Sequence, residues 1–119
     1  MVGVERWDDS AVVLRVRFKV LPIEQWNVRR EYLKRLKRAF DAAGKWIFAI
    51  CHGVQILAAA GVIVQKRVTA YEHCRWEIEA SGATYVSSDE AVRDGRVVTG
   101  QTWQSHPEFY RLVFACLAP

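Results

Sequence analysis

A cysteine, a histidine and a glycine stand side by side as Cys51, His52 and Gly53, directly after a short apolar run. This pattern is typical of a tight strand-to-helix turn, a nucleophile elbow. Such a turn exposes the cysteine side chain, and the backbone N–H groups that follow it can stabilise a thiolate and a developing oxyanion. Cys51 is therefore a candidate nucleophile, with the amides of His52 and Gly53 near the oxyanion position.

Hydrophobic periodicity predicts the elements that position this motif. Residues 46–50 are continuously apolar, which is typical of a strand covered on both faces in a parallel sheet. A helix is expected over residues 54–60, ended by Gly61. Strands and helices alternate further along the chain: strands are expected at residues 67–71, 84–86 and 96–99, and helices at residues 72–81 and from about Ser105.

The segment before the motif changes its period midway. Apolar residues alternate from Val12 to Val20, which predicts a strand with one buried face, and residues 2–7 form a shorter candidate strand. The two strands suit an antiparallel hairpin. From Trp26 to Phe40 the apolar residues recur at helical spacing, and Gly44 is a good stop for the helix.

These elements predict a three-layer α/β fold with a mostly parallel sheet flanked by helices, a flavodoxin-like half with an N-terminal hairpin antiparallel at one edge. The expected order is β-β-α-β-α-β-α-β-β-α. The 119 residues suffice for a single domain over residues 1–119.

Composition restricts the classes of function. No apolar run reaches the ~20 residues that span a bilayer, so we expect a soluble, cytoplasmic protein without membrane contacts and exclude a channel. The three cysteines, Cys51, Cys74 and Cys116, have no metal-ligand spacing, so we expect no metal, no cofactor and no disulfide framework. His73 and His106 are expected on the surface.

Charge is unevenly distributed along the chain. Residues 1–45 carry a net charge of +5 and residues 46–119 a net charge of −1. The basic face of residues 29–38 could attract nucleic acid, but no base-reading motif accompanies it, and a charged helix face is normally solvated. We therefore expect no specific partner and no nucleic acid, and leave open a homodimer through an exposed strand edge.

The stretch AICHGVQILAAAGV resembles the PfpI-type cysteine hydrolase and deglycase superfamily, and the resemblance continues through RVTAY, SGATYV, DEAVRDGRVVTG and TWQSHPEFYRLV, over about residues 44–117. It implies Cys51 as nucleophile, His52 as its base partner and an oxyanion position at the Gly53 backbone. It also implies carboxylates supplied by an N-terminal half and by a subunit interface. Nothing in their spacing aims Glu5, Glu24 or Glu31 at Cys51.

The stretches GVERWDDSAVVLRVRFKV and QWNVRREYLKRLKRAFDAAG, over about residues 3–44, resemble the cytoplasmic C-terminal α/β segment of MscS-type mechanosensitive channels. Two families joined near Gly44 suggest a recombinant, engineered (de novo) chimera. Its segments would be residues 1–44 and 45–119. Trp46, Phe48 and Trp76 are bulkier than the PfpI-type pattern favours, so we interpret them as packing repairs at the seam.

Two functions follow from this interpretation. The main expectation is an engineered chimeric α/β protein with no selected biological activity, in which Cys51 and His52 are vestigial and the chain is not an enzyme. The alternative is a PfpI-type cysteine-dependent hydrolase or glyoxalase/deglycase that uses the elbow thiol. A binding module with a basic surface is a third reading.

Overall fold

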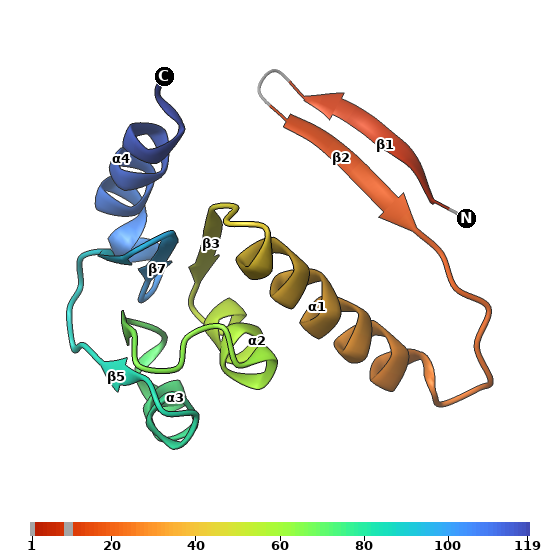
Figure 1. The fold of residues 1–119 in the computed structure, drawn as a ribbon, viewed down its shortest axis with the longest axis horizontal. Coiled ribbons are helices and arrows are strands. Elements are labelled where there is room, and N and C mark those ends of the chain that lie inside the picture. Colours follow the sequence, from red (N-terminus) through yellow and green to blue (C-terminus); the bar gives the residue numbers. More distant parts are fainter. Residues whose placement is uncertain (1, 9–10) are drawn as a thin grey trace.

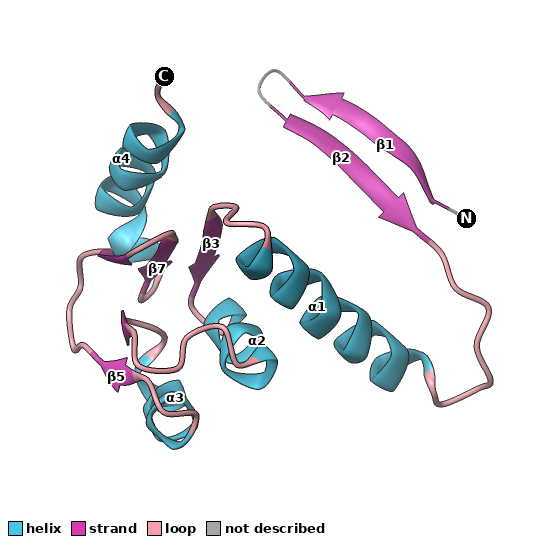
Figure 2. Ribbon diagram, in the orientation of Figure 1, coloured by secondary structure: helices cyan, strands magenta, loops and turns pink. Residues whose placement is uncertain are grey.

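The computed structural model describes residues 2–8 and 11–119 (Figure 1). Helices and strands alternate over most of the chain (Figure 2). In chain order the elements are β1 Val2–Asp8, β2 Ala11–Val16, α1 Gln25–Ala42, β3 Ile47–Ile50, α2 Gly53–Ala60, β4 Arg67–Val68, α3 Arg75–Ala80, β5 Thr84–Tyr85, β6 Val92–Asp94, β7 Val97–Gly100 and α4 His106–Leu117. Short 3-10 turns, Glu72–Cys74 and Trp103–Ser105, lead into α3 and α4.

Helix boundaries follow the local chemistry of the sequence. Gly44, with φ of 63°, ends the turn after α1, and Gly61, with φ of 75°, caps α2. Both angles lie in the left-handed region, which glycine enters without steric cost. Pro107 stands in the first turn of α4, where its missing N–H costs nothing. These boundaries confirm the expected helices over residues 54–60 and from Ser105.

The central sheet is smaller than expected. It has three strands in the order β3-β7-β6, with β3 parallel to β7 and β6 antiparallel to β7. Strand β6 was not expected; it forms a hairpin with β7 around Gly95, whose φ is 58°.

Strands β4 and β5 form a separate parallel pair, so the expected single, mostly parallel sheet is not found among the described residues. Each has only two residues, and neither shares a ladder with β7. A side chain makes the connection instead, because the Thr69 N–H donates to Thr99 Oγ1 at 2.9 Å.

The core lies between this sheet and helices α2 and α3. Its side chains come from strands and helices alike and are almost free of solvent contact: Ile47, Val54, Leu57, Ile63, Val68, Ile78 and Val97. The strand at residues 47–50 thus places one residue fully in the core and leaves the other three half-buried, less covered than the sequence predicted.

The N-terminal strands do not extend the central sheet. β1 and β2 pair antiparallel with each other from Val2↔Val16 to Asp8↔Ala11, and they form a sheet of their own. The predicted place of the hairpin at an edge of the main sheet is therefore wrong. In Figure 1 the hairpin stands beside α1, joined to it by a linker over residues 17–24. Within the described chain no helix is both long and apolar enough to cross a bilayer.

Helix α1, in contrast, packs on the later part of the chain. The Arg38 guanidinium donates to the Ala60 carbonyl at the end of α2, with an Nε–O distance of 2.7 Å. Helix α1 also contacts β3. The helix that precedes Gly44 is thus integrated with the helix that follows the Cys51 turn.

The three bulky residues interpreted as packing repairs do not share one role. Trp46 and Phe48 are half-buried and stack with ring centroids 6.4 Å apart. Arg93 and Arg96 both lie over the Trp46 ring, at 4.9 and 5.3 Å from its centroid. Trp76 is 81% exposed, so it fills no void and the interpretation is wrong for this residue. Its side chain lies on the solvent side of α3, a short helix that buries Ile78 instead.

Candidate functional site

The candidate nucleophile lies at the sharp turn between β3 and α2. Cys51 has φ of 58°, in the left-handed region that a non-glycine residue rarely adopts. Its N–H donates to the Gly100 carbonyl at 3.0 Å, which ties the turn to the end of β7. The continuous strand β3 and the immediate start of α2 leave no room for a relaxed loop, so the turn residue carries the strain.

His52 is placed to interact with the thiol. Its Nδ1 lies 3.2 Å from the Cys51 Sγ, within the range of a hydrogen bond to sulfur. Side chains of adjacent residues rarely form a well-aligned hydrogen bond. Here the left-handed backbone of Cys51 turns the chain between the two side chains, and the Cys51 Sγ and His52 Nδ1 lie within hydrogen-bonding distance. Cys51 is half-buried, whereas the His52 side chain is exposed.

Gly53 begins α2, and the first N–H groups of a helix have no partner within the helix. The Gly53 amide therefore has no partner within α2, and the His52 amide lies directly before it in the chain. A Cβ on Gly53 would approach only the Ala49 Cβ, at 4.0 Å. Steric crowding therefore does not require glycine at this position, and the group that Gly53 offers to the site is its backbone N–H.

Tyr71 is a site residue that the sequence did not single out. Its ring lies against the His52 ring, with centroids 4.9 Å apart, and edge-on to the His73 ring at 5.0 Å. Tyr71 is half-buried and packs on the hydrophobic core, so it gives the exposed imidazole a fixed wall. The signal that could have found it is its position at the end of the expected strand over residues 67–71.

Cys74 lies on the buried side of this region and is 2% exposed. Burial, together with the nearby Glu77 carboxylate and the Cys51 thiol, raises the pKa of Cys74. Its thiol therefore stays protonated at neutral pH and packs as a small apolar side chain in the core. Cys116 on α4 is half-buried, and His73 and His106 are exposed as expected.

The candidate acids of the N-terminal segment interact elsewhere. Glu5 pairs with Arg15, Glu31 with Arg35 at 2.9 Å, and Glu24 accepts from the Asn27 amide at 3.1 Å. Among the side chains that the structure describes, no carboxylate forms a hydrogen bond with Cys51 or His52.

A different acid, Glu77 on α3, contacts the helix that follows the turn. Glu77 accepts a hydrogen bond from the Gln55 side chain on α2 at 2.5 Å, one turn along from His52. The described part of the chain holds no cluster of three or more side chains suited to a metal ion. The arrangement therefore offers thiol, imidazole and backbone N–H groups as its chemistry.

Comparison with known proteins identifies the fold that carries this turn. The model of the DJ-1/PfpI family matches residues 24–115. Protein DJ-1 homolog D of Arabidopsis thaliana is 38% identical over 90 residues, which are 73% of this chain and 23% of that protein. Protein/nucleic acid deglycase 2 of Escherichia coli is 35% identical over 74 residues, 62% of this chain and 43% of that protein.

Solved structures agree on the architecture. The ThiJ/PfpI domain protein of Brachyspira murdochii superposes with a TM-score of 0.66 at 22% identity, over 73% of this chain and 50% of that one. This likeness supports a PfpI-like α/β fold. The chain spans less than half the length of the two curated relatives above.

These matches correct the main functional expectation. The family match begins at residue 24 and so runs through Gly44, where a seam between two families was expected. With α1 packed on α2, an engineered chimera with no selected activity is no longer the best account, and the relatives favour the hydrolase/deglycase alternative. The resemblance of residues 3–44 to MscS-type channels stays a prediction. By the extent of the match, the chain belongs to the DJ-1/PfpI family.

Proposed function

We propose that this chain carries out cysteine-dependent chemistry at a carbonyl carbon, as a deglycase or hydrolase of the DJ-1/PfpI type. The observation that carries the proposal is the strained turn at Cys51, with the His52 Nδ1 3.2 Å from the sulfur. A relative named as a protein/nucleic acid deglycase supports deglycation of adducts over peptide cleavage.

The proposed first step is common to both reactions. The Cys51 sulfur attacks the carbonyl carbon and forms a C–S bond while its proton passes to the His52 Nδ1. The electron pair of the C=O bond moves to the oxygen, and the N–H groups of His52 and Gly53 stabilise the resulting oxyanion. Preorganised donors of this kind typically contribute about 10²–10³-fold to the rate.

Tyr71 and Gly100 are positioning residues in this proposal. The Tyr71 ring restricts the His52 imidazole to orientations that face the sulfur, and the Gly100 carbonyl holds the Cys51 amide at 3.0 Å. Glu77 accepts its hydrogen bond from Gln55, so we assign it no direct contact with the thiol or the imidazole. The site thus relies on backbone geometry and ring packing to orient the thiol and imidazole.

The proposal is tested with methylglyoxal adducts of N-acetylarginine and N-acetylcysteine, followed by NMR, with free methylglyoxal as a separate substrate. We expect release of the free amino acid by the wild-type chain and its loss in Cys51→Ser. Cys116→Ser is the matched control, because Cys116 is also half-buried but lies on α4. Equal turnover by wild type and Cys51→Ser on every substrate would refute the proposal.

Several expectations from the sequence remain predictions beside this proposal. They are the cytoplasmic location, the single domain over residues 1–119, and the absence of nucleic-acid and membrane partners.

A further inference from the structure

Two arginine side chains share one tryptophan ring at the amino ends of strands β3 and β7. The guanidinium carbons of Arg93 and Arg96 lie 4.9 and 5.3 Å from the centroid of the Trp46 ring, so they are at most about 10 Å apart. The Phe48 ring stacks on the same tryptophan, with centroids 6.4 Å apart. The tryptophan thus holds two positive charges close together at one end of the sheet, against their mutual repulsion.

A tight turn fixes the positions of these two arginines. Strands β6 and β7 pair as far as Asp94↔Val97, which leaves Gly95 and Arg96 as a two-residue turn. Gly95 has φ of 58° at the first of the two positions, where tight hairpin turns favour glycine because the angle is positive. The Arg93 Nε donates to the Gly95 carbonyl at 3.3 Å. The backbone of the turn therefore places both guanidinium groups before any ligand arrives.

A third cation stands beside the same turn, and the acid of the hairpin does not pair with it. A Cβ on Gly95 would lie 3.7 Å from the Nζ of Lys66, whose side chain is half-buried. The Asp94 Oδ2 accepts a hydrogen bond from the Arg67 backbone N–H at 2.8 Å instead. Across residues 2–8 and 11–119, none of the three basic side chains forms an ion pair with a carboxylate. The cluster therefore keeps its positive charge.

Cations without carboxylate partners are the groups that bind phosphate. The planar fork of arginine donates two parallel hydrogen bonds to phosphate oxygens, and lysine adds a point charge. We propose that Lys66, Arg93 and Arg96 form a binding site for a diphosphate group, either inorganic or carried by a nucleotide. A terminal phosphate carries about 1.5–2 negative charges at neutral pH, so two linked phosphates match the three cations in charge.

The cluster does not have the form of a nucleic-acid surface. Single strands bind along a basic groove that follows several phosphates, and their bases stack on aromatic rings. Here the Trp46 ring is occupied by its own two arginines and by Phe48, and the cations gather at one turn. A compact diphosphate therefore fits this cluster better than a polymer.

The diphosphate site is separate from the Cys51 turn. Strand β3 begins directly after Trp46 and ends directly before Cys51. A strand advances about 3.3 Å per residue, so its two flanking residues lie about 16 Å apart. A bound diphosphate is too short to reach the thiol, and the inference therefore goes beyond the proposed function and does not depend on it.

The experiment is isothermal titration calorimetry of the full chain in magnesium-free buffer with inorganic pyrophosphate, ADP, citrate and a short oligothymidylate. We expect pyrophosphate and ADP to bind, and the tighter of the two identifies the inorganic or the nucleotide source. Arg93→Gln and Arg96→Gln should each raise the dissociation constant for pyrophosphate at least about tenfold, because each removes charge-assisted hydrogen bonds. Arg96→Lys keeps the charge without the fork, so it should raise this constant less than Arg96→Gln.

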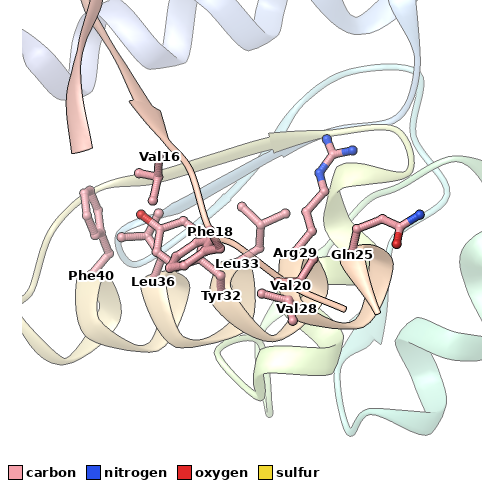
Figure 3. A pocket seen from close by; sticks show the side chains of 10 residues that line it. All are labelled: Val16, Phe18, Val20, Gln25, Val28, Arg29, Tyr32, Leu33, Leu36 and Phe40. Carbon is pink, nitrogen blue, oxygen red and sulfur yellow. The ribbon is translucent and has the colours of Figure 1, made fainter. Parts of the chain in front are cut away.

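Arg29→Gln is the matched control, because Arg29 is also exposed and also lacks a carboxylate partner among the described residues. Figure 3 shows it at the apolar groove that α1 forms with the segment before it. It lies about 20 Å along the helix from Ala42, by the rise of 1.5 Å per residue. Arg29→Gln and Cys51→Ser should both leave the dissociation constant for pyrophosphate unchanged.

Thermal unfolding supplies a second readout, since a ligand of the folded state raises Tm. The rise in Tm with pyrophosphate is measured from the ligand-free Tm of each variant, so a variant that is less stable by itself still reports binding. This rise should persist in Arg29→Gln and be smaller in Arg93→Gln and Arg96→Gln.

Three results overturn the proposal. The first is a wild-type chain that binds neither pyrophosphate nor ADP up to millimolar concentration. The second is citrate, which carries a similar charge on carboxylates, binding as tightly as pyrophosphate, because the cluster then attracts anions without recognising phosphate. The third is equal weakening by Arg29→Gln and Arg96→Gln together with tighter binding of the oligothymidylate than of ADP, which would indicate a nucleic-acid surface instead.

Discussion

Gly100 is the position where one added methyl group should disturb both the core and the candidate site. It ends β7, is buried, and accepts the Cys51 amide hydrogen bond. A Cβ at this position would lie 3.1 Å from two Ile50 side-chain atoms and 3.2 Å from the Phe109 ring. These contacts are closer than ordinary van der Waals distances, and Ile50 and Phe109 approach the position from different elements. Phe109 is buried, so its ring has little room to move away.

The magnitude follows from two opposing contributions. Forcing extra atoms into a packed site typically costs about 1–3 kcal/mol. Replacing glycine by alanine regains about 0.4–1 kcal/mol by restricting the unfolded chain. The net expectation for Gly100→Ala is a loss of about 1 kcal/mol in the free energy of unfolding, or about 4 °C in Tm for a chain of this length.

Urea unfolding monitored by tryptophan fluorescence measures the stability, with Gly3→Ala as the control. A Cβ on Gly3 would meet nothing within 4 Å, so this variant reports the unfolded-state contribution alone. Gly100→Ala should also slow alkylation of Cys51, because the carbonyl that holds its amide shifts. A Gly100→Ala chain as stable as Gly3→Ala would refute the packing argument.

Three further predictions concern the core and the surroundings of the thiol. Tyr71→Phe should retain the rate of Cys51 alkylation, whereas Tyr71→Leu, which removes the ring against His52, should lower this rate about tenfold. The tenfold loss is a part of the 10²-fold or more that a positioned base contributes. Equal rates in both variants would contradict the positioning role. Leu57→Ala should lower the free energy of unfolding by about 2–5 kcal/mol in urea titrations, because Leu57 is 0% exposed, and a loss below about 1 kcal/mol would mean that the site collapses around the smaller side chain. Burial raises the pKa of Cys74 above that of an unfolded thiol, so its contribution to stability is fully present at neutral pH and declines as pH rises into the alkaline range. Cys74→Ala should therefore flatten the alkaline part of a curve of unfolding free energy against pH. An unchanged slope would contradict the argument.

Local patterns predicted the parts of the fold that local chemistry determines. The apolar run before Cys51 forms β3, and the glycines at positions 44 and 61 end α1 and α2. Periodicity also predicted the helix from Trp26 to Phe40, which the structure extends to Gln25–Ala42. In each case neighbouring residues decide the backbone angles.

Pairing between strands that lie far apart in the chain was harder to predict from the sequence. The sequence could not reveal that β4 and β5 are too short to join β7, since this depends on where each chain segment arrives in space. Trp76 was interpreted as a packing repair because of its bulk, but bulk alone does not reveal which face of α3 a residue occupies, and the structure leaves Trp76 81% exposed.

The candidate site likewise contains residues that a local motif reveals and one residue that only the tertiary fold brings in. Adjacent residues revealed Cys51, His52 and Gly53, because the elbow is a local motif. Tyr71 lies nineteen positions downstream of His52 and reaches it only through the tertiary fold. An apolar groove lined by Phe18 and Val20 before α1 and by Leu33 on α1 likewise combines two segments that periodicity treats separately.

The central claim is that the left-handed turn and His52 make Cys51 a working nucleophile. The most direct test is the alkylation rate of each thiol by iodoacetamide at pH 7, measured by mass spectrometry of peptides, in the wild type, in His52→Ala and in the control His106→Ala. Cys51 and Cys116 are both half-buried, so exposure does not separate them. We predict that Cys51 reacts at least about tenfold faster than Cys116, as expected for a thiol beside an imidazole, and that only His52→Ala removes this advantage. Equal rates at the two cysteines, or a Cys51 rate that His52→Ala leaves unchanged, would contradict the account.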